Sequence, residues 1–163
     1  MALSKITNDG VTGLSIDSTG RVLMPQKPLL VAKLTTGNDQ DSVNPYTYGA
    51  LDIHWDAVEI NQGNCYSSST GVFTCPVDGI YNVSFMYITN NDLAAQVASG
   101  IYKEGVLQAQ GYTYAHSTAH ELVSASIDLD CVATNEISVR LISGNIYIDT
   151  VGTHNNFCVK LVG

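Results

Sequence analysis

Basic residues are scarce in this sequence. Seven Lys and Arg stand against fifteen Asp and Glu among 163 residues, so the formal net charge at pH 7 is −8. An acidic protein of this kind repels the phosphates of nucleic acids and the anionic headgroups of lipid bilayers. We therefore expect no nucleic-acid partner and no binding to a membrane surface.

Long apolar runs are missing too. No stretch approaches the roughly 18 apolar residues of a membrane-spanning helix, which argues against membrane insertion. The opening residues, MALSKITNDG, also lack the apolar segment of a secretion signal. We expect the chain to be synthesised and folded in a cytoplasm.

Closely spaced metal ligands are absent. Structural zinc sites draw two ligands from one short turn, as in C-x(2–4)-C, whereas the nearest cysteines here, Cys65 and Cys75, are ten positions apart. His116 and His120 are four apart, which aligns two ligands only on a helix. We expect all the cysteines to be free, mostly buried thiols. A Cys65–Cys75 bridge is the alternative if the two strands around them pair in register.

Catalytic motifs are also lacking. There is no G-x-S-x-G elbow and no phosphate-binding glycine pattern. Asp52, Asp56 and Glu59 are close in sequence, but alternation along a strand would separate Glu59 from the other two. The sequence therefore predicts no enzyme, no catalytic residue and no cofactor. Calcium is the exception left open, with Asp39 and Asp41 as ligands on a loop, although a solvated acidic loop is favoured.

The residues that are abundant favour strands. Apolar residues make up 45% of the chain and charged residues 13%, and Glu-Gly at 104–105 is typical of a tight hairpin turn. Strand-like segments recur at intervals typical of an all-β sandwich. They cover residues 29–34, 51–60, 80–88, 94–102, 106–115, 121–129, 137–142 and 157–162.

Nine tyrosines are the largest aromatic group. Tyr46 and Tyr48, and likewise Tyr112 and Tyr114, are two positions apart, so each pair lies on one face of a strand. Such rings pack within sheets and between protomers, or they bind sugars and proteins. We favour packing or an interface and keep a binding surface as the alternative.

Two motifs in the middle of the chain carry a resemblance. Residues 58–66 follow the pattern V-x-x-N-x-G-x-x-Y, and residues 70–81 follow T-G-x-F-x-x-P-x-x-G-x-Y. Through them, residues 29–163 resemble the complement-q globular head, a member of the tumour necrosis factor-like jelly-roll superfamily. Residues 156–162 keep the apolar alternation of the family's last strand but lack its usual Ser-Phe-x-Gly.

That resemblance implies a ten-stranded jelly-roll sandwich that assembles as a homotrimer. Apolar and aromatic strand faces would meet near the threefold axis, and Tyr81, Val83, Phe85 and Tyr87 are the expected trimer-packing residues. The alternation over 80–88 has no charge on either face, which indicates a strand covered on both sides.

The first 28 residues form a separate segment. Short strand-like pieces lie at residues 14–17, between turn signals at 9–10 and 18–20, and at residues 21–24, after the second signal, which predicts a small β-hairpin. Residues 13–25 are similar to segments that precede such heads in bacteriophage virion proteins. We expect residues 1–28 to be a docking arm or stalk, with Ile16, Val22 and Met24 as docking residues, and residues 29–163 to be the head.

The two resemblances together imply a non-enzymatic protein of the virion exterior. Its partners would be a phage capsid or tail protein, bound through the arm, and a host surface glycan or protein. It would act as a tail-fibre adhesin or decorate the capsid. The alternatives are a cellular lectin-like module and, less favoured, a polysaccharide depolymerase. Recognition is expected at the loop tips of residues 37–45, 89–93, 116–120 and 143–156.

Overall fold

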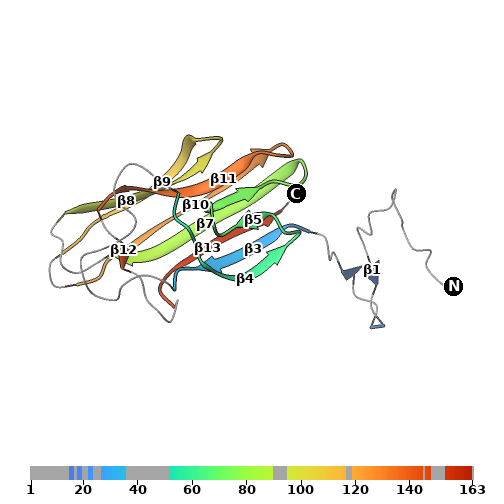
Figure 1. Ribbon diagram of the computed structural model, residues 1–163, viewed down its shortest axis with the longest axis horizontal. Coiled ribbons are helices and arrows are strands. Elements are labelled where there is room, and N and C mark those ends of the chain that lie inside the picture. The colour runs from blue at the N-terminus through green and yellow to red at the C-terminus, as the bar shows by residue number, and fades with distance from the viewer. Residues whose placement is uncertain are drawn as a thin grey trace.

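The fold is a sandwich of two antiparallel β-sheets (Figure 1). It is seen in a computed structural model, which describes residues 15–16, 18–19, 22–23, 27–35, 52–89, 95–116, 119–144, 146–147 and 153–162. The described residues contain no helix that could span a membrane.

One sheet has the strand order β10-β7-β13-β3-β4, and the other has the order β5-β6-β11-β8-β9. The expected ten-stranded sandwich is confirmed. Its strands are β3 (Leu29–Lys33), β4 (Ala57–Gln62), β5 (Tyr66–Ser67), β6 (Val72–Thr74), β7 (Gly79–Thr89), β8 (Gln96–Lys103), β9 (Val106–Tyr114), β10 (Leu122–Cys131), β11 (Glu136–Ser143) and β13 (Asn156–Leu161).

Three short strands lie outside the two five-stranded arrays. β12 (Ile146–Tyr147) pairs with the end of β7, and β1 (Ser15–Ile16) pairs with β2 (Val22–Leu23) in a separate hairpin. The hairpin predicted within the first 28 residues is therefore present. The strand expected over 51–60 begins only at Ala57, because the segment before it leaves the sheet and bonds to β11 through the Ile53 N–H and the Val139 carbonyl.

The core lies between the two sheets. Along β7 every second side chain points inward, and Tyr81, Val83 and Tyr87 are fully buried. Trp55 and Phe157 contact each other with ring centroids 5.7 Å apart. The period-two alternation of the sequence is thus the pattern that fills this core.

Two local features shape the sandwich edges. At Gly111 on β9, an added Cβ would lie 2.6 Å from the backbone carbon of Ser124 on β10, so these strands of opposite sheets are in close contact. On the opposite edge, the pairing of β3 with β4 shifts register between Val31 and Ala32, as at a β-bulge. The Glu104-Gly105 turn joins β8 to β9 as predicted, with φ of 50° and 73°.

Candidate functional site

The first motif, residues 58–66, stabilises a turn through the side chain of Asn61. The side-chain oxygen of Asn61 accepts hydrogen bonds from the backbone N–H groups of Cys65 at 2.9 Å and Tyr66 at 3.1 Å. Its side-chain nitrogen donates to the Tyr66 carbonyl at 2.9 Å. Gly63, with a φ of 88°, makes the tight turn between them. The N-x-G-x-x-Y spacing is therefore explained by the turn that joins β4 to β5.

The tyrosine that ends this motif fixes a second segment. The Tyr66 hydroxyl accepts a hydrogen bond from the Trp55 backbone N–H at 2.9 Å and lies 3.3 Å from the Trp55 carbonyl, to which it donates. In the second motif, Gly71 has a φ of 73°, and an added Cβ would lie 2.6 Å from the Ile53 carbonyl oxygen. Both motifs therefore hold the segment that contains Ile53 and Trp55 in place.

The four residues expected at the trimer axis lie inside one chain. Tyr81, Val83, Phe85 and Tyr87 point into the sandwich and are at most 2% exposed. Their neighbours on β7 point outward instead. The alternation in the sequence correctly predicted that β7 has two distinct faces. The face that we expected to pack at the trimer axis instead packs against the other sheet of the same chain.

Apolar side chains remain on the outer side of the β10-β7-β13-β3-β4 sheet. Ile80 is 37% exposed and Leu122 is 53% exposed, and the register places Leu122 directly opposite Ile88. We call this set the sheet-face patch. It consists of Leu29, Val31, Ile60, Ile80, Met86, Ile88 and Leu122.

A second apolar surface lies on the edge strand of the other sheet. Tyr112 and Tyr114 on β9 are 69% and 62% exposed, and they form the tyrosine pair. The ring of Tyr114 meets His116 edge-on, with centroids 6.3 Å apart. Because both rings are more than half exposed, packing within the chain does not account for them. An interface between protomers and a binding surface remain as interpretations of the tyrosine pair.

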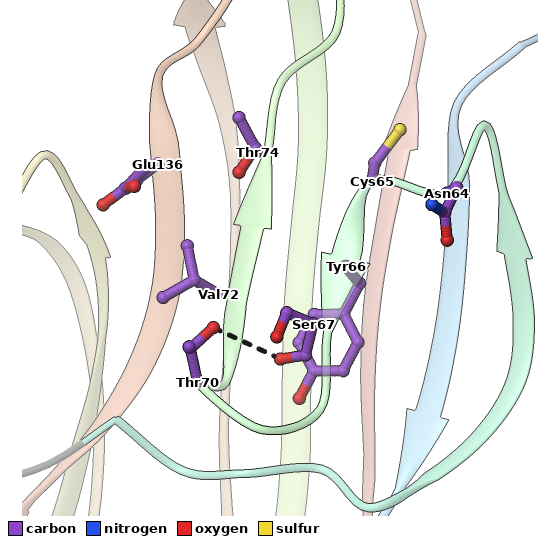
Figure 2. Close-up of a pocket in the computed structure, with 8 residues that line it drawn as sticks. All are labelled: Asn64, Cys65, Tyr66, Ser67, Thr70, Val72, Thr74 and Glu136. Atoms are coloured by element: carbon purple, nitrogen blue, oxygen red, sulfur yellow. Dashed lines mark hydrogen bonds between the residues drawn. The ribbon is translucent and has the colours of Figure 1, made fainter.

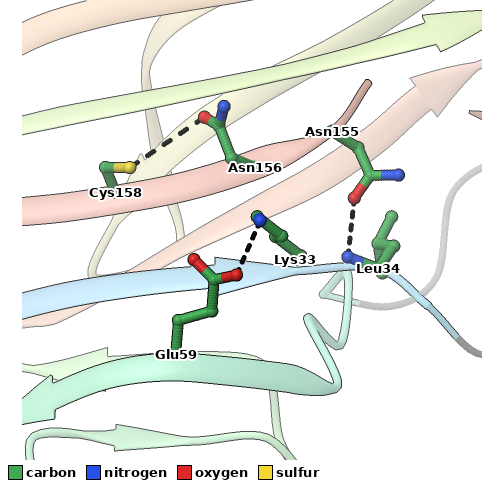
Figure 3. Close-up of polar contacts among 6 residues, drawn as sticks. All are labelled: Lys33, Leu34, Glu59, Asn155, Asn156 and Cys158. Atoms are coloured by element: carbon green, nitrogen blue, oxygen red, sulfur yellow. Dashed lines mark hydrogen bonds and ion pairs between the residues drawn. The ribbon is translucent and has the colours of Figure 1, made fainter. Parts of the chain in front are cut away.

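The carboxylates considered for catalysis each have a structural partner. Asp52 forms an ion pair with Arg140 at 2.7 Å, and Asp56 accepts hydrogen bonds from the backbone and hydroxyl of Thr35 at 2.9 and 2.8 Å. Glu59 pairs with Lys33 at 2.6 Å on the outer side of the sheet (Figure 3). They hold segments together and are not arranged as a facing acid–base pair.

The cysteines are free thiols, as expected, and three of the four are buried. Cys65 does not pair with Cys75: the Cys65 carbonyl accepts a bond from the Thr74 N–H, and the Cys65 thiol lies 3.8 Å from the Gln62 carbonyl. Cys158 is half-buried on β13, with its sulfur 3.9 Å from an oxygen of Asn156 (Figure 3).

Several predicted residues fall outside the described part of the chain. They are the calcium candidates Asp39 and Asp41, the docking residue Met24, and Tyr46 and Tyr48. Within the described ranges, no three His, Cys, Asp or Glu side chains are grouped as metal ligands. Of the docking residues, Ile16 and Val22 lie opposite each other in the β1–β2 hairpin.

A groove lies over β5, β6 and the start of β11 (Figure 2). Its volume is about 630 Å³, within the range of small-ligand sites. The polar lining includes the exposed side chains of Ser67, Thr70, Thr74 and Glu136, with Val72 between them. Among the described residues Glu136 forms no ion pair. Sequence patterns missed this groove because its residues come from three separate strands.

Comparisons with known proteins agree with this architecture. The model of the family described as "C1q domain" matches residues 38–158. One chain of the rat complement C1q subcomponent is 41% identical over 56 residues, which cover 34% of this chain and 22% of that protein. The aligned stretch is thus about a fifth of the length of this relative.

Two solved structures share the fold. The globular domain of zebrafish complement 1qA superimposes with a TM-score of 0.63 at 13% identity, covering 84% of this chain and 98% of that one. Murine APRIL at pH 5.0 gives a TM-score of 0.63 at 11% identity, covering 83% and 99%. At these identities the likeness concerns the fold alone.

These relatives come from rat, zebrafish and mouse, and they give no support to the phage resemblance of residues 13–25. C1q and tumour necrosis factor-like domains are non-catalytic binding modules that usually form homotrimers. The expectation of a non-enzymatic protein is confirmed on that ground. With its two-sheet sandwich and a family match that covers about three quarters of its length, the chain belongs to the C1q domain family.

Proposed function

We propose that this chain acts as a homotrimeric recognition head. The observation that carries the proposal is the presence of two unlike apolar surfaces on one sandwich, the sheet-face patch and the tyrosine pair. Leu122 is 53% exposed and Tyr112 is 69% exposed in the single chain. Burying apolar surface at about 25 cal/mol per Å² favours a contact that covers both.

The positions of the two surfaces favour a ring. They lie on different sheets, so the tyrosine pair of one copy can contact the sheet-face patch of the next. Such head-to-tail contacts close into a ring when the rotation from one copy to the next is a full turn divided by a whole number. Three copies complete the ring in the usual assembly of this family.

Light scattering during size-exclusion chromatography tests the assembly. The wild type should have three times the 17.4 kDa mass of one chain. Leu122→Glu places a charge in the sheet-face patch and should yield monomers, whereas Val132→Glu, at a site of similar exposure outside that patch, should leave the trimer intact. A wild-type monomer, or equal behaviour of the two variants, would contradict the proposal.

The groove favours a glycan as the ligand. Hydroxyl groups of Ser67, Thr70 and Thr74 and the carboxylate of Glu136 can hydrogen-bond to sugar hydroxyls, and Val72 offers apolar contact to a sugar ring. The hydroxyl-rich lining of the groove is the specific observation that supports glycan binding, and it keeps a lectin-like module as the second candidate function.

Binding of the intact protein to an array of immobilised oligosaccharides tests the groove. Glu136→Gln should weaken retention of a bound oligosaccharide about tenfold, the effect of losing one charge-assisted hydrogen bond. The control is Glu121→Gln, which changes a carboxylate beside the start of β10, away from the groove. No retention on the array, or equal loss in both variants, would count against a glycan site.

A narrower proposal concerns the virion. Residues 1–28 would attach the head to a phage capsid or tail, and the loop tips would touch the host on the virion exterior. Its support is the resemblance of residues 13–25 and the β1–β2 hairpin. Antibody labelling of intact particles tests it, because signal on the capsid, on the tail tip, or on neither selects decoration, adhesion, or a cellular module.

A further inference from the structure

Three buried cysteines gather at one end of the core. Cys65 precedes β5, Cys75 follows β6, and Cys131 ends β10, and their side chains are 8%, 1% and 2% exposed. β5 and β6 belong to one sheet and β10 belongs to the other. The three cysteines therefore come from both sheets of the sandwich.

Cys75 and Cys131 are the pair that the fold brings near each other. Cys131 lies in register with Gly79 at the start of β7, and residues 134 and 135, which follow it, bond to the backbone of Cys75. The backbone fixes their approach, because the Cys75 N–H donates to the Asn135 carbonyl at 2.8 Å and the Thr134 N–H donates to the Cys75 carbonyl at 2.7 Å. Cys65 instead directs its thiol to the carbonyl of Gln62.

The turn after β10 is itself held in place. The Asn135 N–H donates to the Val132 carbonyl at 3.1 Å, and the Asn135 side chain accepts from the Val132 N–H at 3.0 Å. Since this turn also bonds to the Cys75 backbone, the ends of β6 and β10 are positioned together by several hydrogen bonds. The two thiols are brought together by the fold even though they are far apart in the sequence.

We propose that Cys75 and Cys131 are an oxidation site, at which an intrachain disulfide forms in the presence of a low-molecular-weight disulfide such as oxidised glutathione. One thiolate attacks the reagent, releases one reduced thiol and forms a mixed disulfide. The second thiolate then displaces the other half. Two protein thiols lose two electrons and two protons, and the reagent gains them as two thiols.

Burial determines when this reaction occurs. Desolvation raises the pKa of the Cys75 and Cys131 thiols, and in the native state both stay protonated and buried. Oxidation is therefore slow in the folded chain and fast while this end of the sandwich is open, as during folding. Once formed, the bond ties the two sheets together.

The experiment refolds the full chain from denaturant in buffer containing oxidised and reduced glutathione, with reduced glutathione alone as the reference. Free thiols are then alkylated under denaturing conditions and the peptides are mapped by mass spectrometry. We expect a peptide pair joined through Cys75 and Cys131, with Cys65 and Cys158 alkylated. The oxidised protein should unfold about 5 to 15 °C higher than the reduced one.

Single variants supply the controls. Cys65→Ser removes the third buried thiol and Cys158→Ser removes the half-buried one, and both should keep the bridge and the raised unfolding temperature. Cys75→Ser and Cys131→Ser should lose both. A Cys65–Cys75 bridge, a glutathione adduct without pairing, or four free thiols at every glutathione ratio would overturn the proposal. Mapping of the wild type decides the matter even if a variant fails to fold.

Discussion

Replacing Gly111 with Ala should separate the two sheets at their shared edge. The new Cβ would fall on the backbone of Ser124, overlapping its carbonyl oxygen and lying 2.6 Å from its carbonyl carbon and 3.1 Å from its nitrogen. Ordinary contact begins near 3.4 Å, so β9 and β10 would have to part by close to 1 Å. No side chain can rotate to relieve this overlap, because every clashing atom belongs to the backbone.

Overpacking of this kind costs about 1 to 3 kcal/mol, and we expect the upper end because two backbones are involved. A loss of about 3 kcal/mol lowers the unfolding midpoint by roughly 6 to 12 °C in a chain of this size. Calorimetry at one fixed protein concentration measures the shift. Gln110→Ala, on the same strand with an exposed side chain, is the matched control and should change the midpoint little. If Gly111→Ala unfolded within about 1 °C of the wild type, the close contact of the edges would be wrong.

Three further outcomes are expected. Tyr66→Phe should cost about 1 to 3 kcal/mol in urea unfolding because the buried backbone N–H of Trp55 loses its acceptor; an unchanged midpoint would contradict this role. Asn61→Ala removes three hydrogen bonds and should cost at least as much, whereas Asn61→Asp should restore part of the loss. Burial raises the pKa of Tyr81 to about 12 and also raises that of Tyr87, so stability should be full below pH 10 and fall as pH rises from 10 towards 12. Tyrosinate absorbance appearing near pH 10 for every tyrosine in folded protein would refute that.

Strands with strong alternation could be located from the sequence. β7, β9 and β11 fall within a residue or two of their expected limits because period two is a local property. The tight turn at Glu104-Gly105 was also predictable, since a two-residue turn of this kind requires positive φ at both positions. β5, β6 and β12 were not found, because two or three residues are too few to show any period.

The site residues were harder to predict for a physical reason. Along β7 both faces are apolar or small, and alternation alone does not say which one meets the second sheet. The approach of Cys75 to Cys131 depends on the pairing of β7 with β10 and of β6 with β11, which lies beyond local sequence. The groove, likewise, exists only after three strands come together.

The edges of the sandwich have a consequence for the behaviour of the protein in concentrated solution. An unpaired, flat strand edge offers a template on which other chains can add strands and grow fibrils. Here β9 and β10 lie against each other, β5 is two residues long, and the pairing of β4 is interrupted by a register shift. Among the described strands, then, the outer edges are short, irregular or covered. Copies of the chain therefore associate through their side chains, and growth of fibrils by hydrogen bonding between strand edges is disfavoured.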